Sequence, residues 1–527
     1  MKRVIHILSL SVSSLMLMSP GIHAQDLQQP WFGLPLPPAF VSHTLPALTG
    51  DRQPVPASVP PGEDRYPELR GPRIREDLEA IVAFSHESRR VQEIGSGQLW
   101  GRITGFPSSA NTVDWSVAQF RAAGIKDVRV QEFTQDADSR FWTPLSWEVR
   151  VIGDDRFGRG SSDVVLETAM PQSPSEIDGI LRAPVVYVGG GGAAAALLAD
   201  VEGKIAIQHI TPQAHLVFER DPAVPRARDL FRRGAVAVVN IIDQPGNERA
   251  LDLSNCGGPC FNVGGRDGAF LEEVMNQAAM AGTLSGLQMQ LQLRSERHTG
   301  LTARNGLAII PGSHPAHADE VIVINAHVDA WFDGAGDNGD GLAVQTALAR
   351  YFARPEHRPE RTLVFLASAG HHTPGLHGPR QFVRMNPALA DNTVVALNIE
   401  HVAQRNFTPA RSQFPDGYRE YVADSVEAPI VAGVSNSAPF INELFREGVQ
   451  RYGVNFVSEA SAMASGEGGG FTPLGVAVVT TMQAPPLYHT SGEVLEAIST
   501  PGLERMARFL AWFITQLDQA EGQQLNP

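Results

Sequence analysis

The sequence predicts an α/β protein in which a doubly wound domain is interrupted by a mostly β domain. Its 527 residues are 43% apolar and 19% charged, a composition typical of folded globular domains. From about residue 303, apolar β-branched runs alternate with helical segments, as expected for a sheet covered by helices. Between about 150 and 290 the chain changes to short strands and glycine-rich turns, which indicates an inserted domain.

The strands of the doubly wound domain are predicted where apolar runs are of the kind buried in parallel sheets. These runs are VIVINA (321–326), TLVFLA (362–367), TVVALNI (393–399) and VAVVTTM (476–482). A connecting helix is predicted over 341–353, because its apolar residues fall on one face. The last helix is predicted to have Thr500 as its N-cap and Pro501 as its first helical residue. Ligands of such a domain bind where the strands end.

The N-terminal and inserted regions give shorter patterns. A helix is predicted to begin near Glu76, followed by an amphipathic stretch at 116–125 and an alternating strand at 128–133. In the insert, short strands are predicted at 204–210 and 235–242. The insert is therefore expected to be built mainly from strands.

The chain is predicted to divide into an export signal, a proline-rich arm, the first part of the doubly wound domain, the insert, the rest of that domain and a tail. The corresponding residues are 1–24, 25–72, 73–148, 149–295, 296–520 and 521–527. The signal has charged Lys2 and Arg3, a short apolar stretch, and Ala24 as the last residue before the cleavage point. The protein is therefore predicted to be exported, to the periplasm or to the medium.

Charge and hydropathy argue against two kinds of partner. With 42 Lys+Arg against 57 Asp+Glu the net charge is −15, which argues against binding to nucleic acid. Beyond the signal, no apolar run reaches the roughly 18 residues that a membrane-spanning helix needs. The two cysteines, Cys256 and Cys260, lie in the run CGGPC. After export a disulfide between them is the leading interpretation, ahead of a metal site or a redox pair.

Imidazole and carboxylate groups follow each of the predicted strands. In chain order they are His327, Asp329 and Asp337, then His371, His372 and His377, then Glu400 and His401, and finally Tyr488, His489 and Glu493. Such donors, gathered at one edge of a sheet, are what a zinc or two-metal hydrolase requires. Each has a structural alternative, since a lone histidine can lie on the surface, Asp337 can cap a helix and Asp329 can accept from a turn amide. Glu400 lies in an apolar run, where an unpaired carboxylate is costly, so a metal site is favoured.

These segments resemble a known family. HVDAWFDGAGDNGDG, which starts at His327, resembles the H-x-D…GA-x-DN-x-x-G signature of the M28 zinc peptidases (aminopeptidase Y/glutamate carboxypeptidase-like), and YHTSGEVLEAI resembles that family's closing segment. The insert resembles a protease-associated (PA) domain through DVEGKIAI, GAVAVVNI and NVGGRDGAFL, in that order. GRITGFPSSANTVDWSVAQFRAAGI, near residue 101, resembles the family's N-terminal helical part. The resemblance implies a doubly wound mixed sheet of the zinc-exopeptidase type with a PA insert, and one or two Zn²⁺ ions as cofactor.

The resemblance also implies roles for single residues. The metal ligands that it implies are His327, Asp337 as the bridge between two ions, Glu400 in place of the family's aspartate, and His489. It implies that Asp329 orients His327 and that Tyr488 helps to hold the oxyanion.

One departure from the family lies after the second strand, where the family has a Glu-Glu pair. This chain has His371 and His372 at that place, followed by Thr373-Pro374, which lengthen the loop. His372 can still bind zinc, and a neutral His371 can take a proton from water in place of the glutamate base. The exchange removes negative charge, so the second ion is expected to bind more weakly, and nearby cations would weaken His371 as a base.

Three functions are compatible with this sequence. The first is an exported metal-dependent exopeptidase, an aminopeptidase rather than a carboxypeptidase, that hydrolyses peptide bonds. The second is a catalytically silent relative that uses the same scaffold for binding, because the Glu-Glu pair is absent. The third is a metallohydrolase that acts on small amides.

Overall fold

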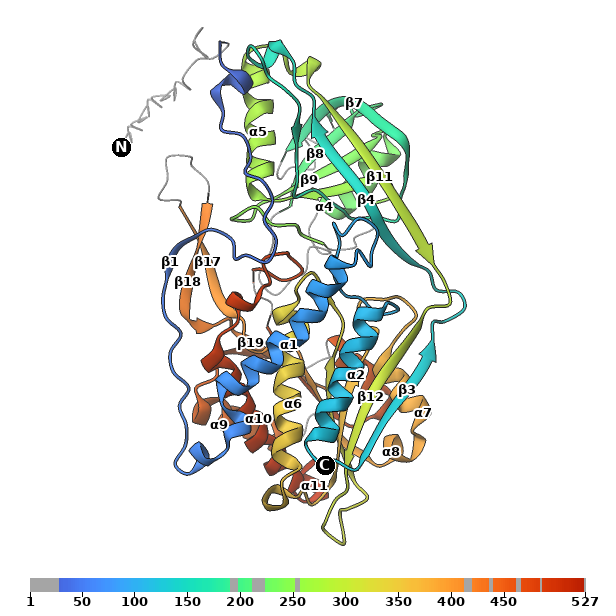
Figure 1. Cartoon of the computed structure of the whole chain (residues 1–527), viewed down its shortest axis with the longest axis vertical. Coiled ribbons are helices and arrows are strands. Elements are labelled where there is room, and N and C mark those ends of the chain that lie inside the picture. Colours follow the sequence, from blue (N-terminus) through green and yellow to red (C-terminus); the bar gives the residue numbers. More distant parts are fainter. Residues whose placement is uncertain are drawn as a thin grey trace, which may run out of the picture.

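The computed structural model describes residues 28–189, 198–210, 223–251, 256–411, 419–435, 439–460, 466–483 and 486–525. The predicted export signal at 1–24 lies outside these residues. Within them the chain forms two lobes that follow one another along the longest axis (Figure 1). We call them the main lobe, which holds the sheet of the doubly wound domain, and the inserted lobe, whose sheet is built between Phe141 and His298.

The sheet of the main lobe has the strand order β20-β19-β21-β16-β13-β15-β12-β3. These strands are β3 (Asp127–Thr134), β12 (Thr302–Ile310), β13 (Val321–His327), β15 (Thr362–Ser368), β16 (Thr393–Ile399), β19 (Ile430–Ser435), β20 (Phe456–Ala460) and β21 (Ala477–Gln483). The central strands β21, β16, β13 and β15 run parallel, whereas β12 pairs antiparallel with both β15 and β3. The predicted doubly wound, mixed α/β sheet is therefore confirmed, and each of its predicted central strands lies within one residue of its predicted bounds.

Apolar residues fill both faces of this sheet. In β13, Ile322 and Ile324 point to one face, and Val321 and Val323 point to the other. The first face is covered by α1 (Gly71–Arg90), α2 (Pro107–Ala122), α6 (Gly341–Phe352), α9 (Pro439–Tyr452) and α10 (Thr500–Asp518). The second face is covered by α7 (Gly378–Met385), α8 (Pro387–Asp391) and the 3₁₀ segment η10 (Gly466–Leu474). Burial on both faces explains why the central strands read as continuous apolar runs.

Two predicted helix starts are wrong. Helix α1 begins at Gly71 rather than near Glu76, because Pro72 in its first turn needs no hydrogen-bond acceptor there. Helix α10 has Ser499 rather than Thr500 as its N-cap, since the Ser499 hydroxyl accepts a hydrogen bond from the Gly502 N–H at 3.0 Å. Thr500 is instead the first helical residue.

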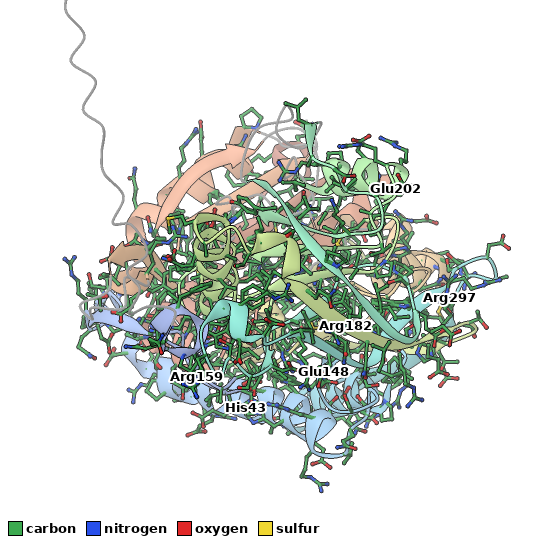
Figure 2. All side chains as sticks on the ribbon, turned by 90° about the horizontal axis from the view of Figure 1, so that it is seen from above. His43, Glu148, Arg159, Arg182, Glu202 and Arg297 are labelled. Atoms are coloured by element: carbon green, nitrogen blue, oxygen red, sulfur yellow. A yellow bond between two sulfur atoms is a disulfide. The ribbon has the colours of Figure 1, made fainter. Side chains whose placement is uncertain are left out.

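The inserted lobe has a sheet of strand order β5-β4-β11-β7-β8-β9-β10-β6. Its elements are β4 (Phe141–Val151), β5 (Val164–Val165), β6 (Met170–Pro171), β7 (Ile177–Gly189), β8 (Ile205–Ile210), α4 (Ala223–Arg232), β9 (Ala237–Ile242), β10 (Cys260–Val263), α5 (Gly265–Met280) and β11 (Gln288–His298). The long pair β4–β11 reaches down to β3 and β12 of the main lobe (Figure 1). Figure 2 looks down on this lobe and labels Glu148, Arg182 and Arg297 on its long strands. Cys256 and Cys260 form a disulfide in the apolar cluster next to α4. The PA assignment of this lobe stays a prediction.

The N-terminal arm contacts both lobes. Trp31 is buried in the inserted lobe and stacks on Phe157 with ring centroids 5.8 Å apart. Farther along, β1 (Leu48–Asp51) pairs parallel with β18 (Arg419–Glu427), which pairs with β17 (Arg405–Arg411). Figure 1 shows the arm, in blue, running from the inserted lobe along the side of the main lobe. The predicted tail contains the short helix α11 (Gly522–Leu525). No helix within the described ranges is both long and apolar enough to span a bilayer.

Candidate metal centre

The topology brings the predicted site residues to one edge of the main sheet. His327 is the last residue of β13, His371 and His372 follow β15, and Glu400 follows β16. His489 follows β21, the outermost strand of this parallel group. Neighbouring parallel strands end at the same edge, so these side chains converge where the fold class places its ligands.

The Asp337 carboxylate lies at the centre of the site, between two pairs of imidazoles. Its Oδ1 is 3.2 Å from His327 Nε2 and 2.9 Å from His401 Nε2. Its Oδ2 is 3.2 Å from His372 Nε2 and 3.0 Å from His489 Nε2. All five side chains are buried or nearly so. One carboxylate with each oxygen facing two imidazole nitrogens has the geometry of a bridge between two cations.

Hydrogen bonds on the far side of two rings fix which nitrogen carries the proton. His327 Nδ1 lies 3.0 Å from the backbone oxygen of Asp329, and His401 Nδ1 lies 2.9 Å from the backbone oxygen of Gln483. A carbonyl oxygen only accepts, so each Nδ1 donates and each Nε2 presents a lone pair to Asp337. Lone pairs that face a carboxylate need a cation between them, either a proton or a metal ion.

Several buried polar atoms at this site have no hydrogen-bond partner among the described residues. They are His327 Nε2, Asp337 Oδ2, His372 Nδ1, Glu400 Oε2 and His489 Nδ1. The Nε2 atoms of His372 and His489 also lie only 3.2 Å apart. Buried atoms of this kind are normally satisfied, and nitrogen and carboxylate donors are the ligands that Zn²⁺ takes. The residues present therefore fit a zinc site.

Asp329 lies behind the imidazoles and holds the turn after β15. Its carboxylate accepts the backbone N–H of His372 at 2.9 Å and that of His371 at 3.4 Å. It also lies 3.5 Å from His327 Nδ1, whose shorter contact is to the Asp329 backbone. Burial alone would raise the pKa of Asp329, but the contacts with His327 and His372 hold it well below its usual range. Asp329 therefore orients two segments of the site rather than one histidine.

The electrostatics of the centre favour cations. Burial opposes protonation of His372 and His401, but the charge of Asp337 raises the pKa of each to about 9. Burial lowers the pKa of His489 to about 4. Because imidazole must lose its proton to bind a metal ion, protons and metal ions compete for His372 and His401.

Glu467 connects the turn after β15 with Glu400. Its Oε1 lies 3.0 Å from His371 Nδ1, and its backbone N–H donates to Glu400 Oε1 at 2.8 Å. Asn398 Nδ2 donates to the same Glu400 oxygen at 2.9 Å. The His371 ring stacks on His327 with centroids 4.3 Å apart. The His371 Nδ1–H is therefore held by a carboxylate, and the other ring nitrogen, Nε2, is the atom that can act as a base or a ligand.

Sequence reasoning listed His401 without giving it a role and did not include Glu467. His401 follows Glu400 directly, and its place beside Asp337 depends on a left-handed backbone with φ +46°. Glu467 belongs to η10, a segment that the sequence analysis did not connect with His371. Tyr488 stacks on His489 with centroids 3.8 Å apart, and its role at the oxyanion stays a prediction.

The chain matches a known protein family in this region. Residues 305–514 match the model described as Peptidase family M28. This stretch contains all the ligand candidates described above. The part of the chain that holds the candidate metal centre is therefore similar to peptidase family M28.

Two curated relatives match shorter stretches of the chain. A vacuolar membrane protease of Sclerotinia sclerotiorum is 39% identical over 86 residues, which are 16% of this chain and 8% of that protein. A probable glutamate carboxypeptidase of Arthroderma benhamiae is 34% identical over 117 residues, 21% of this chain and 15% of that protein. The chain therefore spans less than a sixth of the curated relatives that it matches.

Solved structures share the fold of the M28 domain and of most of the chain. The peptidase M28 precursor of Shewanella amazonensis is 19% identical, with 86% of this chain and 98% of that chain covered and a TM-score of 0.58. The zinc aminopeptidase of Bacillus subtilis is 17% identical, with 87% and 98% covered and a TM-score of 0.56. At these identities the likeness concerns the fold.

Proposed function

We propose that this protein is a metal-dependent peptidase whose metal centre is built around Asp337. The observation that carries the proposal is the Asp337 carboxylate, whose two oxygens each lie within 3.2 Å of two imidazole nitrogens. This arrangement lies inside the M28 domain, at the strand ends of an α/β sheet. The family match supports peptide-bond hydrolysis as the reaction.

Two groups of residues would hold the ions. Asp337, His372 and His489 would hold one ion, and His327 and Asp337 would hold the other. Either Glu400 or His401 completes the second set, because both offer a donor atom near His327. When bound, zinc activates water and polarises the scissile carbonyl. Histidines in place of carboxylates lower the negative charge of the site. Its ions would therefore be held mainly by bonds to neutral imidazole nitrogens rather than by attraction to carboxylates.

His371 is the proposed general base. Its Nδ1–H is held by Glu467 at 3.0 Å, which leaves the Nε2 lone pair to accept a proton from water. The Glu467 carboxylate also stabilises the imidazolium that forms, and so offsets the effect of nearby cations. Tyr488, which stacks on His489, would contact the oxyanion.

We further propose that the protein is an exported exopeptidase that removes residues from the amino end of peptides. Support comes from the signal-like sequence at 1–24 and from a structural neighbour described as a zinc aminopeptidase. The relative described as a probable glutamate carboxypeptidase supports the alternative, removal of residues from the carboxyl end. Small amides are the alternative substrates. The inserted lobe, as a PA domain, would help to form the cleft in which the substrate binds.

Replacement of His327 tests the proposed function. In His327→Ala the chain loses a nitrogen ligand, so bound zinc and chelator-sensitive hydrolysis should both fall to near background. His314→Ala is the matched control, because His314 is an exposed histidine of the same lobe. Metal content is measured by elemental analysis and hydrolysis with a peptide substrate. Full hydrolysis by His327→Ala would rule out this metal centre.

The alternative that this protein is a catalytically silent relative is tested by His371→Glu, which introduces the glutamate that the family has at this place. If His371 is a working base supported by Glu467, the variant should lose activity or gain little. A gain of several hundredfold over an inactive parent would instead indicate a decayed active site.

A further inference from the structure

A second group of side chains that could hold a metal ion lies outside the metal centre. It consists of His43 on the N-terminal arm, His86 on α1 and Asp333, which follows β14 (Ala330–Trp331). His43 Nδ1 is 2.7 Å from Asp333 Oδ1, and His86 Nε2 is 2.8 Å from Asp333 Oδ2. We call these three residues the arm site. Figure 2 labels His43 on the arm.

The carboxylate of the arm site is held rigidly. Trp100 Nε1 donates to Asp333 Oδ1 at 2.9 Å. The backbone oxygen of Asp333 accepts hydrogen bonds from Arg102 Nη1 at 2.8 Å and from Ser85 Oγ at 3.1 Å. The Trp100 hydrogen bond is of the kind that orients a metal-ligating carboxylate, and the other two hold the Asp333 backbone. Asp333 is therefore fixed by the main lobe before the arm contacts it.

The arm adopts an uncommon conformation to reach this carboxylate. His43 has φ +63°, a left-handed backbone that residues other than glycine seldom adopt. The His43 and His86 rings lie with centroids 4.0 Å apart, each turned toward its own oxygen of Asp333. The site stays open to solvent, because the side chains of His43 and His86 are 32% and 40% exposed.

We propose that His43, His86 and Asp333 bind a divalent transition-metal ion, and that this ion fastens the N-terminal arm to the main lobe. One donor atom from each residue lies within 4.8 Å of the others. Two imidazoles and one carboxylate are a donor set that Zn²⁺ accepts, with water in the open position. Arg89 lies 4.2 Å above the Trp100 ring and interacts electrostatically with Asp333, so its positive charge would make the ion more weakly held than a buried zinc ion.

A metal ion at the arm site would act on both lobes. Beyond His43 the arm continues to Pro46, which contacts Gly246 of the inserted lobe and Gly492 near His489. Asp333 itself precedes the segment that carries Asp337. The ion would therefore hold the arm against the loops that carry Asp337 and His489. It would not itself be one of the ions of the metal centre.

The test counts bound metal ions in the full-length protein. Metal-free wild type and His86→Gln are each titrated with Zn²⁺ or Co²⁺, and the number of ions bound is measured. Glutamine keeps an N–H that can donate to Asp333, so a lost hydrogen bond does not explain a difference. We expect His86→Gln and His43→Gln to bind one ion fewer than wild type, and His314→Gln to bind the same number. Equal stoichiometry of His86→Gln and wild type would overturn the proposal.

A second measurement separates the arm site from the metal centre. In His327→Ala/His489→Ala, which lacks two ligands of that centre, Zn²⁺ should still raise the melting temperature by several degrees, because a ligand that binds only the folded state stabilises it. Adding His86→Gln should abolish this rise. If Zn²⁺ raises the melting temperature of the double and the triple variant equally, or of neither, an ion at the arm site is excluded. This conclusion holds whether or not the protein is a peptidase.

Discussion

At the residue scale, the site could be predicted in part. The ends of buried strands marked His327, His372, Glu400 and His489 as a group, because parallel strands end together. The contacts of Glu467 with His371 and of His401 with Asp337 could not be predicted, since they depend on a turn in η10 and on a left-handed backbone. Such contacts arise from tertiary packing and leave no spacing in the sequence.

Glu467 gives a prediction at this scale. Glu467→Gln removes the charge that orients His371 through the 3.0 Å contact and leaves the backbone donation to Glu400 intact. We expect the kcat/KM for a peptide substrate to fall about 10- to 100-fold, as for other orienting partners, while zinc content stays the same. Glu496→Gln, at an exposed position, is the control. Unchanged kinetics would show that Glu467 does not position His371.

At the element scale, the buried strands were the best predicted parts. Apolar runs such as 362–367 have few alternatives to a central strand, whereas helix ends depend on single caps. The start of α10 shows this, because Ser499 and Thr500 are both good caps and the structure uses the first of them. Local chemistry alone does not choose between neighbouring hydroxyls.

The cap of α10 gives a prediction at the element scale. Ser499→Ala removes the acceptor of the Gly502 N–H and a hydrogen bond to Glu427. The free energy of unfolding should fall by about 1–2 kcal/mol, the usual cost of losing a cap. Thr500→Ala should change it by less than about 0.5 kcal/mol. The two variants are compared by denaturant unfolding, and equal losses would contradict the assigned cap.

At the scale of the whole molecule, the inserted lobe supports the loop that carries His489. Leu251 N–H donates to the His489 backbone oxygen at 3.0 Å, and Ser491 N–H donates to the Arg249 backbone oxygen at 2.9 Å. Glu248 is buried beside this contact and accepts from Ser491 Oγ at 2.7 Å. The sequence predicted an insert but gave no sign of this contact, because the segments lie far apart in the chain.

Glu248 makes this contact dependent on pH. Burial raises its pKa to about 7, so the folded state binds a proton more tightly than the unfolded state, whose carboxyl has its ordinary pKa of 4.5. The free energy of unfolding therefore falls as the pH rises from about 4.5 to about 7. A glutamine does not titrate, so the stability of Glu248→Gln does not change in this way. Its free energy of unfolding minus that of wild type should therefore be about 2 kcal/mol greater at pH 8 than at pH 5.

The control for this prediction is Glu202→Gln, which changes an exposed carboxyl of the same lobe. Its stability relative to wild type should be the same at both pH values. Chemical denaturation at pH 5 and pH 8 measures all three proteins. If Glu248→Gln also differs from wild type by the same amount at both pH values, Glu248 is not buried in the contact described.

The most direct test of the central claim is a mass-spectrometric profile of a mixed peptide library incubated with the purified protein. The profile is recorded with zinc supplied and again after a chelator. The proposed metal-dependent aminopeptidase should remove residues stepwise from the amino end of the peptides, and this removal should stop when the chelator is added. A folded, zinc-loaded protein that leaves every peptide intact would contradict the account.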